Sequence, residues 1–155
     1  MQIYTLLQEQ RLGCPLQEAF AFFSDPYNLD KITPGWLHFR IVDAPPKLYR
    51  GCLLHYRLRL HGVPLTWVSQ IVEWDPPCRF IDVQVIGPYR LWHHVHEFEP
   101  IGDGMLVRDI VHYALPLSWL GRLAHQFLVR RDRERIFAYR RERILQLLSP
   151  FSRGQ

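Results

Sequence analysis

The chain has 155 residues, of which 48% are hydrophobic and 22% are charged, with a formal net charge of +4. This composition excludes a disordered or fibrous chain and matches a globular protein built around one core. No apolar run approaches the roughly 20 residues that a membrane-spanning helix needs, so a transmembrane anchor is excluded too.

Local patterns in the first third of the chain predict short elements. Residues 2–12 alternate as a strand does, and they lack the basic start and apolar centre of a signal peptide. Residues 15–25 predict a helix that begins at Pro15. Residues 26–34 predict a helical turn, and residues 38–43 predict a short strand.

Longer alternating runs follow, separated by turn signals. They predict strands over 51–62, 63–75, 78–100 and 105–116, and the third run contains two strands hinged at Gly87-Pro88. Helical spacing then predicts one long helix from Ser118, as its N-cap, to about Leu148. The apolar face of this helix comprises Leu120, Leu123, Phe127, Phe137, Ile144 and Leu148.

This order predicts an α+β fold: a strand, two short helices, about six strands and a long helix. An antiparallel meander must cover its apolar face, and the long helix is the available cover. A strongly curved sheet around one helix leaves a cavity unless bulky side chains fill it. We expect one domain over 1–155, with 149–155 as a disordered tail.

The segments that carry a family resemblance are "FAFFSDPYNLDKITP", "GVPLTWVSQI", "PPCRFIDVQVIGPYRLWHHVHEF" and "DIVHYALP". Together they resemble the SRPBCC or START-like superfamily, in its branch of small bacterial ligand-binding, polyketide cyclase/dehydrase-like proteins. The resemblance implies a helix-grip fold, in which a curved antiparallel sheet of about six or seven strands surrounds the C-terminal helix. It also implies a deep apolar pocket between them. The chain departs from this pattern at Arg133, near which relatives carry an apolar residue.

Strand alternation sorts the side chains into two faces. The inward set on 53–60 is Leu54, Tyr56, Leu58 and Leu60; on 65–73 it is Leu65, Trp67, Ser69, Ile71 and Glu73; on 89–99 it is Trp92, His94, His96 and Phe98; and on 107–115 it is Val107, Asp109, Val111, Tyr113 and Leu115. Strand 79–86 is ambiguous, because Ile81, Val83 and Val85 also look like a core face. The family phrase "RFIDVQ" favours Phe80, Asp82 and Gln84 facing inward.

These faces predict a ligand pocket with apolar walls and a polar cluster. The walls are Tyr56, Trp67, Phe80, Trp92, Phe98 and Tyr113, and the residues that would anchor a polar head group are Asp82, Gln84, His94, His96 and Asp109. Buried polar groups must be hydrogen-bonded. We therefore expect His–Asp pairs across neighbouring strands, which would raise the pKa of the histidine.

Three functions remain open at this stage. The first is a carrier or sensor that binds a small apolar, aromatic or lipid-like ligand. The second is a cyclase- or dehydratase-like enzyme, in which His94 helped by Asp82 moves a proton and Tyr113 is a candidate proton donor. A metal centre would use His94 and His96 with Asp82 or Asp109. A His-x-His pair arises easily by chance in a chain with 8 histidines, so we expect no metal and no cofactor.

The third possible function rests on an arginine-rich segment, "RRDRERIFAYRRER" at 130–143. Its seven arginines against Asp132, Glu134 and Glu142 account for the whole net charge of +4. Interspersed acids favour a solvated helix face with ion pairs between residues four apart, and we expect no nucleic-acid partner. A transient membrane-surface or protein contact is the remaining use of this segment. Three widely spaced cysteines indicate reduced thiols and a cytoplasmic protein.

Overall fold

The computed structural model describes residues 2–116 and 130–148. The expected N-cap Ser118, the apolar positions Leu120, Leu123 and Phe127, and the expected tail 149–155 lie outside these ranges. Among the described residues, no helix combines the length and the apolar character that crossing a membrane requires.

The described chain forms one antiparallel sheet of seven strands in the order β1-β7-β6-β5-β4-β3-β2. The strands are β1 (Tyr4–Leu12), β2 (Arg40–Asp43), β3 (Leu53–Leu60), β4 (Val63–Asp75), β5 (Arg79–Ile86), β6 (Leu91–Ile101) and β7 (Gly104–Ala114). Consecutive strands from β2 to β7 are neighbours, as short turns between alternating runs predict. The separation of β5 from β6 at Gly87-Pro88 is confirmed.

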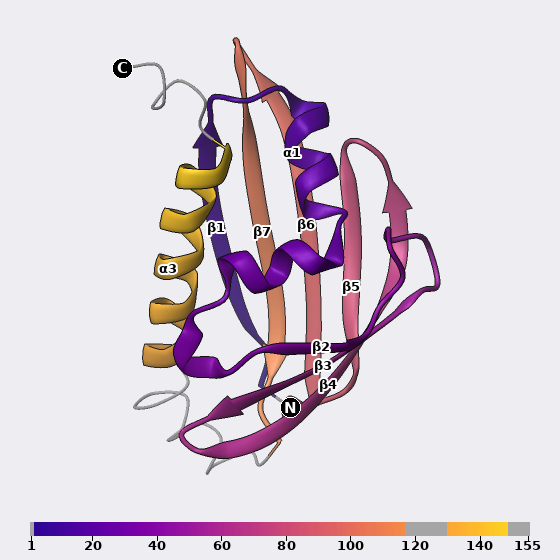
Figure 1. Cartoon of the computed structure of the whole chain (residues 1–155), viewed down its shortest axis with the longest axis vertical. Coiled ribbons are helices and arrows are strands. Elements are labelled where there is room, and N and C mark those ends of the chain that lie inside the picture. The colour runs from indigo at the N-terminus through magenta and orange to yellow at the C-terminus, as the bar shows by residue number, and fades with distance from the viewer. Residues whose placement is uncertain (1, 117–129, 149–155) are drawn as a thin grey trace.

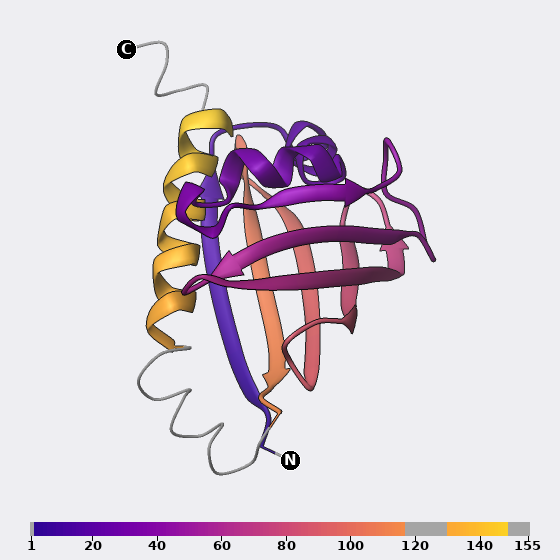
Figure 2. The same cartoon turned by 60° about the horizontal axis from the view of Figure 1, so that its bottom comes forward.

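The sheet is strongly curved, and one long helix lies against its concave side (Figure 1). In Figure 2 the strands β2, β3 and β4 run across β1, β7 and β6, so the two ends of the sheet face different directions. The helix α3 (Arg130–Leu148) runs beside β1 and contacts η1 (Pro26–Ile32). The helix-grip fold that the resemblance implied is therefore confirmed.

Short helices after β1 cover one end of the sheet. In α1 (Leu16–Phe23), Ala19 and Phe20 are buried, and the Phe20 ring contacts the rings of Trp74, Phe80 and Phe98. The turn η1 begins after Asp25, whose carboxylate accepts a hydrogen bond of 3.0 Å from the Tyr27 backbone N–H, and this is a common N-cap. A further turn, η2 (Gly35–Leu37), leads into β2.

The main core lies at this covered end. Ile144 and Leu148 of α3 are buried there, and Phe137 is half-buried in a second cluster around Val111 and Tyr113, as the helical spacing predicted. The main core therefore fills one end of the molecule and does not extend over the middle of the concave face.

One inward residue was assigned wrongly, and the cause is a β-bulge. The register between β4 and β5 shifts between Ile71 and Glu73. Two residues of β4 therefore lie opposite one residue of β5, and beyond this point the inward and outward positions of β4 are exchanged. Glu73 faces outward, where a carboxylate oxygen lies 2.5 Å from an Arg79 guanidinium nitrogen, and Trp74 takes the inward place.

Candidate ligand-binding site

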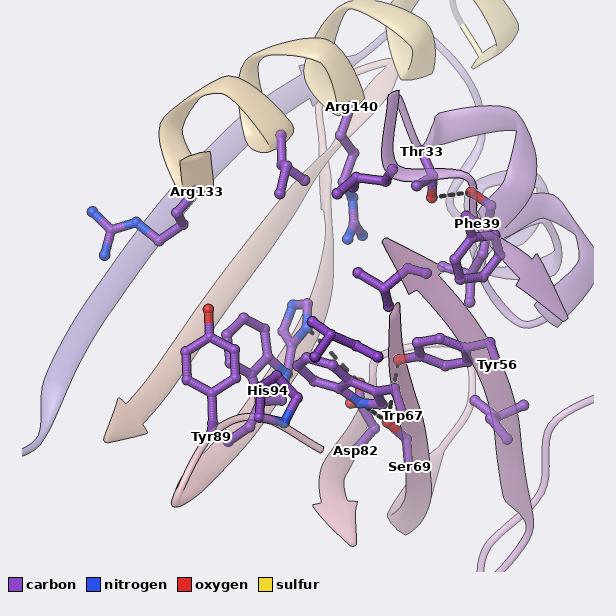
Figure 3. A pocket seen from close by; sticks show the side chains of 18 of the residues that line it. Thr33, Phe39, Tyr56, Trp67, Ser69, Asp82, Tyr89, His94, Arg133 and Arg140 are labelled. Carbon is purple, nitrogen blue, oxygen red and sulfur yellow. Dashed lines mark hydrogen bonds and ion pairs between the residues drawn. The ribbon is translucent and has the colours of Figure 1, made fainter. Parts of the chain in front are cut away.

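A pocket of about 510 Å³ lies between the concave face of the sheet and α3. This volume lies within the range typical of small-molecule sites. Most of its lining is apolar, and Figure 3 shows side chains from α3 and from the turn that carries Thr33 above the pocket, with side chains of the strands, among them Trp67 and His94, below it. The side chains that alternation assigned inward on β3, Leu54, Tyr56, Leu58 and Leu60, all line it.

Most of the residues proposed from the sequence also line the pocket. They are Tyr56, Trp67, Phe80, Asp82, Trp92, His94 and His96. Phe80 and Asp82 face the pocket, which settles the ambiguous register of β5 in favour of the inward assignment. Phe80 stands opposite His96, and Asp82 stands opposite His94.

Four proposed residues do not line this pocket. Phe98 packs in the core against Phe20. Tyr113 is completely buried behind Trp92 and Tyr89. Strand alternation reports which face a side chain shares, but it does not report how deeply neighbouring side chains cover it.

The other two, Gln84 and Asp109, form hydrogen bonds with neighbouring residues of the protein. The Gln84 amide donates to the Tyr89 carbonyl at 2.7 Å and accepts from the Tyr89 N–H at 3.1 Å. It thereby holds the β5–β6 connection. Asp109 lies beneath His94 and accepts from it, as described below.

Several lining residues were missed, both in the segments between β1 and β3 and on α3. Arg133, Ile136, Phe137 and Arg140 all line the pocket. Their spacing of three, four and seven residues is that of one helix face. The helical spacing of these residues is visible in the sequence. It was not interpreted as a pocket face because two of the residues are arginines, and charged residues are expected on the solvent side.

Two histidines and two aspartates form a buried network in the pocket wall. The Nε2 atom of His94 lies 2.8 Å from a carboxylate oxygen of Asp109, and Nε2 of His96 lies 2.6 Å from one of Asp82. The second nitrogen of each ring faces the other carboxylate, at 3.8 Å for His94 with Asp82 and 3.5 Å for His96 with Asp109. An ionised carboxylate can only accept, so each Nε2–H donates.

This pairing corrects the expected dyad. The sequence paired His94 with Asp82, and these residues do stand opposite each other on neighbouring strands. The short hydrogen bonds nevertheless run diagonally, so that His94 bonds to Asp109 and His96 bonds to Asp82. The expected His–Asp pairing across strands is present, with the partners exchanged.

The expected rise of the histidine pKa is wrong for His96. Burial, together with the adjacent His94 ring, lowers the pKa of His96 to about 4, and the hydrogen bond to Asp82 only partly offsets this. Burial alone would raise the pKa of each aspartate. At Asp82, the hydrogen bond from His96 and the two nearby imidazoles lower the pKa by more than burial raises it. At Asp109, Arg140 and the same two imidazoles have this effect. Both carboxyl pKa values therefore lie below normal.

The donor atoms of Asp82, His94 and His96 lie within 4.8 Å of one another, close enough to suggest a metal site. The arrangement suits hydrogen bonding better. The two imidazoles are stacked 3.7 Å apart at 26° from parallel, so their in-plane lone pairs run side by side instead of meeting at one point. The guanidinium of Arg140 lies 3.7 Å from Asp109 and opposes a second cation nearby.

An aromatic wall stands beside this network. Trp67 is buried and donates its indole N–H to the Ser69 hydroxyl at 2.8 Å. Its ring meets Trp92 edge to face with centroids 5.3 Å apart, and Tyr56 stacks on its other side. Burial raises the pKa of Tyr56 far above its ordinary value, so its hydroxyl remains neutral.

The arginine-rich helix makes many contacts within the protein. Arg133 donates to the Tyr113 hydroxyl, which explains how a charged residue is accommodated at a position where the resemblance implied an apolar one. Arg141 donates to the Glu9 carbonyl at 2.8 Å, and Arg143 donates to the Lys31 carbonyl at 3.1 Å. The predicted pairing of residues four apart occurs between Arg130 and Glu134. This helix therefore offers fewer free cations than its sequence indicates.

Comparisons with known proteins agree with this architecture. The model of the family described as "Polyketide cyclase / dehydrase and lipid transport" matches residues 12–138. A search of curated proteins found no significant match.

Many solved structures share the fold. Protein TTHA0849 of Thermus thermophilus is 18% identical, with a TM-score of 0.70 over 93% of this chain and 99% of that one. Protein CV1439 of Chromobacterium violaceum is 13% identical, with a TM-score of 0.74 over 95% of this chain and 99% of that one.

A third structure is the di-domain ARO/CYC StfQ from the steffimycin biosynthetic pathway. It is 13% identical, with a TM-score of 0.76 over 99% of this chain and 52% of that one. At these identities the likeness shows the fold alone. The family match, which spans most of the sequence, carries the assignment further: the chain belongs to the polyketide cyclase/dehydrase and lipid transport family of SRPBCC-type domains.

Proposed function

We propose that this protein binds a small, largely apolar ligand in the pocket between its sheet and α3, as a carrier or sensor. The observation that carries the proposal is the pocket itself, about 510 Å³ in volume and lined mostly by apolar side chains. Removing an apolar molecule from water into such a site is favourable in proportion to the area buried. The family description, which names lipid transport, supports the same class of ligand.

The few polar groups in the lining would orient the ligand. Asp82, His94, His96 and Arg140 form one polar cluster in the lining, held together partly through Asp109, and the leucines of β3 also line the pocket. A ligand with one polar end would place that end at the network and its apolar part along Leu58 and Leu65. Such a division is usual in small-molecule sites, where a small number of polar groups determines orientation.

The first experiment is native mass spectrometry of protein purified without organic solvent, in search of a co-purified apolar molecule. The second is titration with the apolar fluorophore N-phenylnaphthylamine. Ile136→Trp fills the pocket from α3 and is expected to weaken probe binding by about tenfold or more. The control Leu145→Trp adds the same side chain at an exposed position of α3 outside the pocket lining, and it should bind as the wild type does.

The proposal fails if wild-type protein carries no apolar molecule and shows no saturable probe binding. It also fails if Ile136→Trp, shown to be folded by its circular dichroism, binds the probe with unchanged affinity.

A second candidate function is an acid–base enzyme of the cyclase or dehydratase type. The observation that favours it is the network, in which two imidazoles line an apolar pocket and each donates to a buried carboxylate. This arrangement orients a neutral imidazole as a general base. The low pKa of His96 keeps that ring neutral near pH 7. Tyr113 does not line the pocket, so it is a poor candidate for the proton donor.

Acetophenone in deuterated water tests this candidate, because a general base in the pocket would accelerate exchange of its α-protons. Wild-type protein should catalyse the exchange, and His94→Gln and His96→Gln should each abolish it. A carrier would instead show the rate of buffer alone while still binding N-phenylnaphthylamine.

A further inference from the structure

Arg140 projects from α3 into the middle of the pocket. Figure 3 shows its side chain reaching from the helix toward His94 on the sheet below. Its side chain is only 13% exposed, and it is a lining residue of the pocket. A guanidinium carries five N–H donors and keeps its charge at any ordinary pH, so this position places a permanent cation in an apolar chamber.

The described residues provide few hydrogen-bond acceptors for the Arg140 guanidinium. The closest acidic group is Asp109, with a carboxylate oxygen 3.7 Å from an Arg140 terminal nitrogen. That same oxygen already accepts the 2.8 Å hydrogen bond from His94. The Nε atom of Arg140 is buried without a hydrogen-bond partner among the described residues. Removing a charge from water costs several kcal/mol unless acceptors replace the water.

Aromatic faces compensate for part of this cost. The guanidinium carbon lies 5.8 Å from the Phe23 ring centroid and 5.9 Å from that of Phe137. Such cation–π contacts are worth about 0.5 to 2 kcal/mol, but a ring face provides no hydrogen-bond acceptor for the N–H groups that lie in the guanidinium plane. The Nε atom of Arg133 is likewise buried without a partner among the described residues, but a terminal nitrogen of Arg133 already donates to the Tyr113 hydroxyl.

We propose that the ligand carries a carboxylate, and that Arg140 is the residue that binds it. This inference rests on the proposed ligand-binding function and specifies its ligand class: an amphipathic acid with a single negative charge. The limit of one charge follows from Asp82 and Asp109, which lie beside the same guanidinium and disfavour a doubly charged phosphate. The apolar part of the acid would extend along Leu58, Leu65 and Ile136.

The geometry suits this assignment. A guanidinium presents parallel N–H groups that match the two oxygens of a carboxylate. The two terminal nitrogens of Arg140 would supply these donors, because the Nε atom is covered by protein atoms. One terminal nitrogen lies 3.7 Å from Asp109, too far for a hydrogen bond, so a bound acid would provide this guanidinium with an acceptor.

The test compares dodecanoate with methyl dodecanoate, which share the chain length and differ in charge. Binding is followed by the fluorescence of Trp67 and Trp92, both in the pocket lining. Wild-type protein is expected to bind the acid about ten- to a hundredfold more tightly than the ester, as a charge-assisted hydrogen bond predicts. In Arg140→Gln the acid should lose about ten- to a hundredfold in affinity, so that its preference over the ester disappears.

Arg131→Gln is the matched control, because Arg131 is exposed on the same helix and is absent from the pocket lining. It should keep the full preference. If Arg140→Gln does not fold, Arg140→Lys serves instead: it keeps the charge but loses the paired donors, and the preference should fall severalfold.

The possible outcomes separate the two proposals. Equal affinity of wild-type protein for acid and ester overturns the carboxylate assignment and leaves apolar binding intact. A preference that survives in Arg140→Gln overturns the role of Arg140. If wild-type protein binds neither probe, the proposed function fails together with this inference.

Discussion

His94 stacks on His96 with their ring centroids 3.7 Å apart, and each ring donates to the carboxylate that lies diagonally across the sheet from it. Asp82 belongs to β5 and Asp109 to β7, so the stacked pair on β6 joins three neighbouring strands through side chains. Because all four groups are buried or nearly so, the network should affect both stability and binding.

Acidification should destabilise the protein through His96. Its pKa lies near 4 in the folded state and near 6.5 in an unfolded chain. The unfolded state therefore binds more protons between these values, and stability falls as the pH decreases through this window. From about pH 7 to about pH 5 the loss attributable to this group is about 2 kcal/mol.

Urea unfolding at both pH values, for wild type and for His96→Gln, measures this contribution. The difference between the two proteins gives the contribution of His96 together with that of its contact with His94. An equal loss of stability in both proteins would show that His96 is not the group responsible.

Removing the charge of Asp109 should be costly. Asp109→Asn leaves Arg140 without its carboxylate neighbour and weakens the hydrogen bond from His94. Breaking such a buried arrangement costs about 3 kcal/mol, to be measured as the free energy of unfolding in urea. Asp103→Asn makes the same chemical change at an exposed turn and should alter stability by less than about 0.5 kcal/mol. Similar values for the two variants would contradict a structural role for the network.

The indole of Trp67 depends on Ser69 for its hydrogen bond. Ser69→Ala removes the acceptor 2.8 Å away and should destabilise the fold by about 1 to 3 kcal/mol, the cost of a buried unpaired donor. In a Trp67→Phe background no donor is stranded, so the same substitution should cost less. A double-mutant cycle in urea gives the coupling energy directly, and a coupling near zero would refute this account.

A contact across the pocket joins the β3–β4 hairpin to α3. The turn residues His61 and Gly62 both have positive φ, at 50° and 80°, as a tight two-residue hairpin requires. This turn brings the His61 ring nitrogen within 2.7 Å of a carboxylate oxygen of Asp132, which is buried on α3.

Asp132→Ala should loosen this attachment, and hydrogen exchange should become faster in the backbone of the β3–β4 hairpin. His61→Ala should have the same effect, and the double variant should add little to either. Unchanged exchange in both single variants would show that the hairpin is held by other contacts.

Much of the fold was predictable because it follows from local patterns. Period-two alternation with turn residues located the strands, and the spacing of Phe137, Ile144 and Leu148 located the helix face that packs inward. Glu73 shows the limit of this approach. A bulge adds one residue to a strand and shifts the phase of its alternation. The sign of it in the sequence is small: a glutamate at the expected inward position, followed by an aromatic residue.

Fewer of the residues that line the pocket could be predicted from the sequence than of the elements that form the fold. The inward faces of β3, β4, β5 and β6 contain many of the lining residues, but Arg133 and Arg140 were assigned to a solvated helix surface. Charged residues on a helix usually face water. They can line a pocket only when another element lies across from them, and that element is distant in the sequence.

Where the strands lie, and which of their side chains share a face between bulges, are properties of neighbouring residues, so the order of amino acids was enough to find them. The exchange of partners between the two histidines and two aspartates depends on how far β5, β6 and β7 are displaced along one another. The position of Arg140 above them depends on how α3 lies across the sheet. Both are relations between segments far apart in the chain, and they arise when the whole molecule packs.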